Sequence, residues 1–296
     1  LQAGSGSVTF AANTLNRSNN GVLLLSPSAG ANLGSTEKVT VASGAPTVTN
    51  GIVAPYYIDG TTRNFVTYGA NGFQDITYSV VGTTDTDIAN ANASSTVVIS
   101  NSTFNTSIGG NKAIYALKLV QTNNTFNANA IGVSGETLTL LSGGLSLDMT
   151  AGGGINFSSD TTRASINFGT TEAMVGVFGS NAALGSAPWI GTGGLTVYGT
   201  GSLQATNVSI TGGVTIAGAT IRLGGSNGIN TNNQLTIDKA GTFSFIGSNS
   251  QQFLGLSGEG LITNSLNGAT FVVDGLTGMG TTSFSGLIQN GSGTIA

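Results

Sequence analysis

The sequence predicts an all-β fold, a right-handed parallel β-helix with about three short strands in each coil. Within residues 207–246, apolar side chains stand two positions apart in short runs, which is the period of a strand and not of a helix. Glycine and asparagine separate the runs and favour tight bends. The runs recur after about 21 residues, a period typical of solenoids. They are Val208/Ile210, Val214/Ile216, Ile221/Leu223, Leu235/Ile237 and Phe243/Phe245.

Residues 1–296 are expected to form one elongated unit. An antiparallel sandwich would need longer strands and hairpin turns, whereas short strands with frequent corners favour a chain that winds one way. Successive coils would stack about 4.8 Å apart, and a solenoid has no size at which it must divide. We expect Ile216 and Ile237 to point into the core, and Thr215 and Thr236 to face water and tolerate a charge.

The composition removes several classes of function. Charged residues make up 7% of the chain, against about a quarter in ordinary soluble domains, and the few basic residues are scattered. We therefore expect no nucleic-acid partner. The chain has no cysteine and no histidine, which removes thiolate metal sites and the commonest general base. No apolar run approaches the roughly 18 residues of a membrane helix, so we expect no membrane insertion by this segment.

The strand rhythm is broken briefly at residues 26–28 and then over one longer segment. Residues 7–25 carry it, but residues 52–95 are rich in aromatic side chains and end in a polar loop. This segment is predicted to leave the coil as an excursion or lid. The rhythm returns at Val97 and continues to Val177, and helix content is expected to be close to nil.

The aromatic side chains of the excursion are the candidate functional residues. Aromatic rings supply rigid contact area with a polar edge, so they could form a platform for a glycan or a partner protein. The alternative is that they pack over the flank of the coil, and the sequence favours this alternative. Trp189 is likewise expected to be a packed residue. The five candidates are Tyr56, Tyr57, Phe65, Tyr68 and Phe73.

Paired carboxylates would indicate an enzyme, because some parallel β-helices cleave polysaccharides. Asp85 and Asp87 lie two apart, and Glu136, Asp148 and Asp160 are separated by between half a coil and a coil. A glycosidase needs two carboxyl groups about 5–9.5 Å apart. Asp85 and Asp87 lack nearby aromatic residues, and the other acids lack a basic cluster for a uronate beyond Arg163, so solvated turns are the favoured interpretation. The glycine runs also lack the aspartates of calcium-binding repeats, and no cofactor is expected.

One segment carries a resemblance to a known family. Residues 193–203, GGLTVYGTGSL, resemble the GGLTKxGxGTLxL unit of the passenger-associated transport repeats in autotransporter-type bacterial surface proteins. Val197, Ser202 and Ala205 depart from that unit. Residues 276–296 look like the lead-in to another such unit. The interior of large β-strand-repeat surface proteins is also similar to residues 50–73, 117–119 and 138–145.

The resemblance implies a secreted or surface-displayed β-solenoid without catalytic residues of its own. The expected function is therefore a non-enzymatic structural or adhesive section of a larger bacterial surface protein or fibre, located outside the cell or on its surface, with a surface glycan as one conceivable ligand. Two alternatives stay open. One is a secreted carbohydrate-active β-helix, a lyase or glycosidase, and the other is a phage-type or pilus-type fibre subunit.

Both ends of the chain look ready to continue a stack of coils. Residues 1–10 are strand-like from the start, and residues 284–296 keep apolar side chains up to the last positions. Natural solenoids cover such ends with a helix or a polar repeat. We expect either continuation in a longer chain or self-association into a filament.

Overall fold

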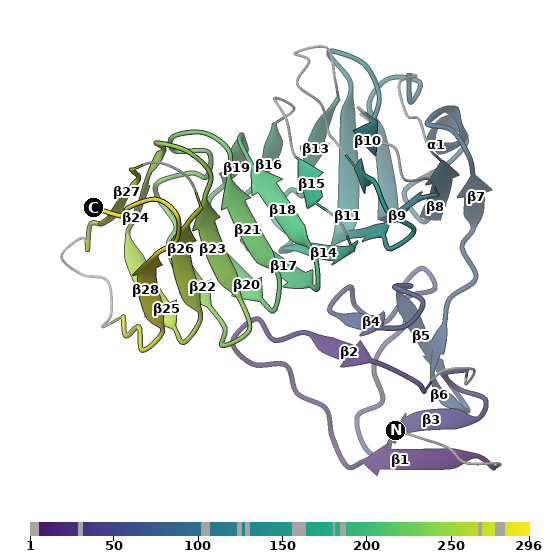
Figure 1. Ribbon diagram of the computed structural model, residues 1–296. Coiled ribbons are helices and arrows are strands. Elements are labelled where there is room, and N and C mark those ends of the chain that lie inside the picture. Colours follow the sequence, from purple (N-terminus) through teal and green to yellow (C-terminus); the bar gives the residue numbers. More distant parts are fainter. Residues whose placement is uncertain are drawn as a thin grey trace.

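The computed structural model is all-β, with long parallel sheets that are compatible with a β-solenoid (Figure 1). It describes residues 6–28, 32–101, 107–122, 126–127, 131–155, 164–179, 181–183, 188–265, 268–275 and 282–296. Two parts can be distinguished. The described residues from 79 onward form a stack of parallel strands, and those from 6 to 78 form a smaller N-terminal unit beside it. We call them the stack and the N-terminal unit.

The main face of the stack is a run of nine parallel strands within a 12-stranded sheet. They are β7 (Val80–Gly82), β8 (Thr96–Asn101), β9 (Lys112–Gln121), β11 (Thr137–Met149), β14 (Ala173–Gly179), β17 (Leu195–Gly199), β20 (Val214–Ala217), β22 (Gln234–Ile237) and β25 (Gly255–Gly258). The other three strands, β13 (Ser165–Asn167), β16 (Trp189–Gly191) and β19 (Val208–Ile210), branch from the first part of β11.

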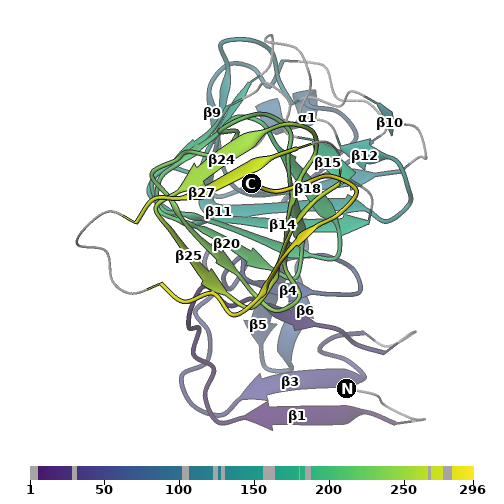
Figure 2. The same cartoon turned by 60° about the vertical axis from the view of Figure 1, so that its left-hand side comes forward.

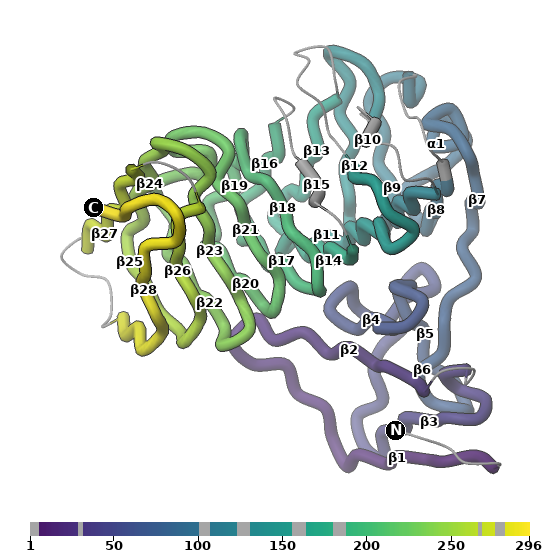
Figure 3. The backbone as a smooth tube through the Cα atoms, in the orientation of Figure 1, coloured from purple at the N-terminus to yellow at the C-terminus, as the bar shows by residue number. Residues whose placement is uncertain are grey.

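The remaining strands of the stack pair on its other sides. A six-stranded sheet contains β15 (Asn181–Ala183), β18 (Ser202–Ala205), β21 (Thr220–Leu223), β23 (Thr242–Phe245), β26 (Leu261–Asn264) and β28 (Leu287–Asn290). Two further pairs are β10 (Phe126–Asn127) with β12 (Gly154–Ile155), and β24 (Ser250–Phe253) with β27 (Thr270–Val273). In Figure 3 the backbone passes repeatedly along the same sides of the stack.

Apolar side chains form a continuous ladder inside the main face. Val175, Val197, Ile216 and Ile237 are register partners in successive strands, and each is fully buried. The inward orientation of Ile216 and Ile237 is therefore confirmed. The ladder begins with Val97, Leu117 and Leu145, which are also fully buried.

Strand β11 turns a corner of the stack in the middle of its length. Its first residues pair with β13 and its last with β14, and the register against β9 shifts between Leu140 and Gly144. Gly143 occupies the bend with a φ of 76°, a conformation that side chains other than glycine rarely adopt. A Cβ at this position would also overlap the carbonyl oxygen of Glu172.

The N-terminal unit contains three two-stranded sheets of its own. Strands β1 (Val8–Ala12) and β3 (Glu37–Val41) pair in parallel, as do β2 (Leu23–Leu25) and β4 (Tyr57–Asp59). Strands β5 (Val66–Gly69) and β6 (Gly72–Asp75) form an antiparallel hairpin. In the described residues, strands that precede residue 52 thus pair within the N-terminal unit and not with the stack, whereas the sequence predicts that only residues 52–95 leave a single solenoid over residues 1–296. Period-2 patterning predicts that a strand forms, but not which strand it pairs with.

Residues 80–95, expected in the excursion, belong to the beginning of the stack. Strand β7 pairs with β8 in the main sheet. The only helix of the described residues, α1 (Thr86–Ala89), packs its fully buried Ile88 into the core of the stack. No helix in the described part of the chain is long and apolar enough to cross a membrane.

The N-terminal unit covers the outer surface of the main face. Met174, Phe178 and Tyr198 point away from the core of the stack, yet all three are buried in a second cluster with Ile58 and Phe65. The Tyr198 hydroxyl donates to the carbonyl oxygen of Pro55 at 3.1 Å. Strands of the main face are therefore apolar on both sides where the N-terminal unit packs against them.

Candidate functional site

The five aromatic candidates are divided between two cores. Phe65 packs against the stack, and Phe73 packs with Tyr57 inside the N-terminal unit. Phe65 and Phe73 have no exposed surface, and Tyr57 is 7% exposed. Tyr68 and Tyr56 are partly exposed. The five side chains thus do not form one open platform, and their positions favour the packing interpretation.

Tyr68 and Tyr56 each have a structural contact. The Tyr68 hydroxyl accepts a hydrogen bond from the backbone N–H of Val41 at 2.7 Å. The Arg17 guanidinium lies over the Tyr56 ring, 4.4 Å from its centroid, a distance at which cation–π attraction is effective. Arg17 also pairs with Glu172 of the stack at 2.5 Å. The loop around Arg17 is therefore fastened to the stack.

Most carboxylates hold the fold together instead of sharing a cleft. Glu136 is 7% exposed and accepts hydrogen bonds from Ser107 and from backbone N–H groups. Burial opposes the charge, but these hydrogen bonds outweigh it and lower the pKa of Glu136. Structural hydrogen bonds or ion pairs engage Glu37, Asp59, Asp75, Asp87, Glu136, Asp148, Glu172 and Asp274.

The described carboxylates of the acid pairs considered from the sequence are each bound to other groups of the fold. Asp85 is fully buried, while Asp87 accepts hydrogen bonds from the backbone N–H groups of its own loop, which lowers its pKa. Glu136 binds Ser107 and backbone N–H groups, whereas Asp148 contacts Lys118 and Thr150. Asp160 lies outside the described residues.

A polar groove beside the N-terminal unit holds the two remaining described carboxylates, Asp238 and Glu259. The groove has a volume of about 570 Å³. In the described part of the chain, neither side chain has a hydrogen bond or ion pair. Nearby protein atoms raise the pKa of Asp238 by partial desolvation, although the side chain is exposed. The groove is lined by Asn19, Asn20, Thr215, Thr236, Asp238, Lys239, Ser257, Gly258 and Glu259.

The parallel register of the strands builds the floor of this groove. Thr215, Thr236 and Ser257 are register partners in β20, β22 and β25, and the hydroxyls of Thr236 and Ser257 lie 2.9 Å apart. Thr215 is only 3% exposed and accepts a hydrogen bond from the Asn20 amide at 3.1 Å. The prediction that Thr215 faces water is therefore wrong, because the N-terminal unit covers it.

Sequence reasoning missed this groove although a signal was present. Asp238 follows Ile237 and Glu259 follows Gly258, and the two preceding residues are register partners. Two acids that each follow one of two register partners are expected on neighbouring strands, and this spacing would have identified Asp238 and Glu259 as a pair. Hydroxyl, amide, carboxylate and ammonium groups suit a polyhydroxylated ligand, but no aromatic residue lines the groove. The described residues contain no group of three or more metal-ligating side chains of histidine, cysteine, aspartate or glutamate.

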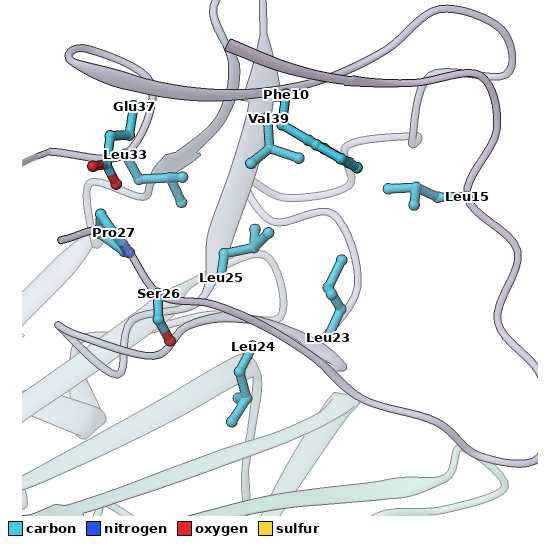
Figure 4. A pocket seen from close by; sticks show the side chains of 10 residues that line it. All are labelled: Phe10, Leu15, Leu23, Leu24, Leu25, Ser26, Pro27, Leu33, Glu37 and Val39. Carbon is cyan, nitrogen blue, oxygen red and sulfur yellow. The ribbon is translucent and has the colours of Figure 1, made fainter. Parts of the chain in front are cut away.

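A second hollow lies inside the N-terminal unit and is mainly apolar. It has a volume of about 200 Å³, and Phe10 at its margin is 53% exposed. Figure 4 shows Phe10, Leu25 and Val39 directed toward the same space. The carboxylate of Glu37 is bound by Ser28 and supplies no free polar group. This hollow is a small apolar gap among β1, β2 and β3.

Comparison with protein-family models, with curated proteins and with solved structures finds no match to this chain.

Proposed function

We propose that this chain is a non-enzymatic structural or adhesive section of an extracellular surface protein or fibre, folded as a right-handed parallel β-helix with about three strands per coil. The observation that carries the proposal is the open edge at the C-terminal end of the stack. Figure 2 looks toward this end, with β24 and β27 in front. An unpaired strand edge presents backbone N–H and C=O groups to another strand.

The last strands of the stack expose apolar side chains. All four residues of β28 are exposed, with Leu287 at 55% and Ile288 at 50%. In the neighbouring β27, Val272 is 40% exposed and Val273 is 45% exposed. Such side chains gain free energy when another layer covers them, at roughly 25 cal/mol per Å². A further coil, from a continuing chain or from a second copy, fits this edge.

The opposite end of the stack is different. Helix α1 lies there with Ile88 fully buried in the core, as a capping element does in other solenoids. In the described part of the chain, the end at β7 is thus partly closed, and the end at β28 is open because β28 pairs with β26 alone. Growth of the stack is therefore proposed in one direction only, whereas the sequence predicts that both ends are ready to continue.

The association state of charged variants tests this proposal. Ile288→Lys places a charge on the open end, and Val81→Lys places one on the opposite end, where Val81 is 75% exposed. Sedimentation velocity at rising protein concentration should show larger species for the unmodified chain and for Val81→Lys. Ile288→Lys should stay monomeric. A monomer for all three proteins at every concentration would contradict self-association.

A carbohydrate-active enzyme is the second candidate, and the polar groove favours it. Asp238 and Glu259 are free carboxylates one ladder step apart, and two carboxyl groups are the usual machinery of glycoside hydrolysis. Release of reducing sugar from a panel of polysaccharides would support this candidate if Glu259→Gln abolished it. Asp87→Asn is the matched control, since Asp87 binds its own loop. If sugar release survived in Glu259→Gln, the groove would be excluded as the active site.

A further inference from the structure

A lysine and an asparagine meet at the junction between the N-terminal unit and the stack. Lys118 lies on β9 between two inward leucines, so its side chain leaves the outer surface of the main face. The N-terminal unit covers it, and Lys118 is only 5% exposed. Its Nζ donates to the Asn64 Oδ1 at 2.9 Å and to the Thr62 carbonyl oxygen at 2.6 Å. The amine of Lys118 therefore contacts the side-chain amide of Asn64 in a site that is almost fully buried from solvent.

Two carboxylates flank this contact. The Asp148 Oδ2 lies 3.4 Å from the Lys118 Nζ, and Asp148 is 7% exposed. On the other side, the Asn64 Nδ2 donates to the Asp75 Oδ2 at 3.0 Å. The amide thus lies between an amine and a carboxylate, and a second carboxylate contacts the amine.

The surroundings favour a reactive amine and a polarised amide. Burial lowers the pKa of Lys118, although Asp148 opposes the shift, and a neutral amine is the nucleophilic form. The Tyr78 hydroxyl donates to the Asn64 Oδ1 at 3.4 Å. Burial raises the pKa of Tyr78, so this hydroxyl keeps its proton. It is placed to stabilise negative charge that develops on Oδ1.

We propose that Lys118 and Asn64 become joined by an intramolecular isopeptide bond. The ammonium of Lys118 gives one proton to Asp148, and the neutral Nζ attacks Cγ of Asn64. The bond between Cγ and Nδ2 breaks as the new bond between Nζ and Cγ forms. A second proton from Nζ goes to Nδ2, beside Asp75, and the former amide nitrogen leaves as ammonia. No electrons are transferred, and the products are an amide, ammonia and protonated Asp148.

The bond would fasten the N-terminal unit to the stack covalently. It would link residues 54 positions apart, and a cross-link of that span restricts the unfolded chain much as a disulfide does. The chain has no cysteine, so no disulfide supplies such a link. Lys112 provides a comparison within the same strand: its Nζ donates to the Ala89 carbonyl oxygen at 2.6 Å and makes no hydrogen bond to a side-chain amide of the described residues.

Peptide mapping of the purified full chain tests the proposal. Trypsin cleaves after Arg63, Lys112 and Arg163 but not after an amidated Lys118. The expected product is a branched peptide that joins residues 64–112 to residues 113–163 and lacks the mass of one ammonia. Fragmentation must place the branch at Asn64 and Lys118, because a succinimide elsewhere also loses ammonia. Recovery of the unbranched peptide 113–118 in full yield would overturn the proposal.

Variants distinguish the reaction from a simple structural contact. Asp148→Asn removes the carboxylate that accepts the proton from Lys118, keeps the size of the side chain and should abolish the branched peptide, while the emission of the buried Trp189 stays native. Asn64→Ala and Lys118→Arg should also give only linear peptides. Lys112→Arg should leave the branch intact. A branched peptide that persists in Asp148→Asn would overturn the role of that carboxylate as the proton acceptor.

Discussion

Replacing Ile216 with alanine should lower the free energy of unfolding by about 4 kcal/mol, within the range of about 2–5 kcal/mol measured for such truncations in protein cores. Ile216 has no exposed surface, and its register partners Val197 and Ile237 are also fully buried. Because strands pair on both sides, the surrounding backbone has little freedom to close the cavity. We therefore expect the upper part of the range.

Denaturant titration followed by tryptophan emission measures this effect. Trp189 is the single tryptophan and has no exposed surface in the native stack. The control is Thr236→Ala, since Thr236 is a partly exposed residue of the groove floor in β22, beside Ile237. This control should cost less than about 1 kcal/mol, the net worth of a typical hydrogen bond. Equal losses for Ile216→Ala and Thr236→Ala would refute the assignment of inward and outward faces.

Three further predictions concern single contacts. Arg17→Ala should cost about 1 kcal/mol or less, because the ion pair with Glu172 is partly exposed, and limited proteolysis should then cut the loop around residue 17 faster. The pKa of Glu136 is lowered in the native state. The carboxylate therefore stabilises the fold above its ordinary pKa near 4.3, and this stabilisation is lost as pH falls through the native pKa. Melting temperatures of Glu136→Gln should depend less steeply on pH below about 4.5 than those of the unmodified chain. Gly199→Ala should destabilise by more than about 1 kcal/mol, because Gly199 has a φ of 107° and a Cβ would overlap the Val177 carbonyl oxygen, whereas Gly225→Ala has open space and should be nearly neutral in the same melts.

The sequence alone predicts the inward ladder of apolar residues in the stack, but it does not predict which segment covers the outer surface. Alternation places Leu117 and Leu119 inward and Lys118 outward, and this part of the prediction is local. The burial of Lys118 depends on Thr62 and Asn64, which dock from a distant segment. No pattern with period 2 contains that information.

One unused signal was available for the docking surface. Met174 and Phe178 alternate with the inward Val175 and Val177, so β14 is apolar on both sides. A strand with both faces apolar is typical of a sheet that is covered on both sides. The position of the cover was therefore predictable, although the identity of the covering segment was not.

The long-range contacts of the N-terminal unit have a consequence for the order of folding. Arg17 and Asn20 bind Glu172 and Thr215, which follow them by 155 and 195 residues. The stack, by contrast, pairs strands that are near neighbours in the chain, so it can nucleate locally and propagate. The N-terminal unit is thus synthesised before the stack but reaches its final contacts after the stack has formed. During that interval Met174, Phe178 and Tyr198 stay uncovered, and a chaperone or a second chain has its best opportunity to bind there.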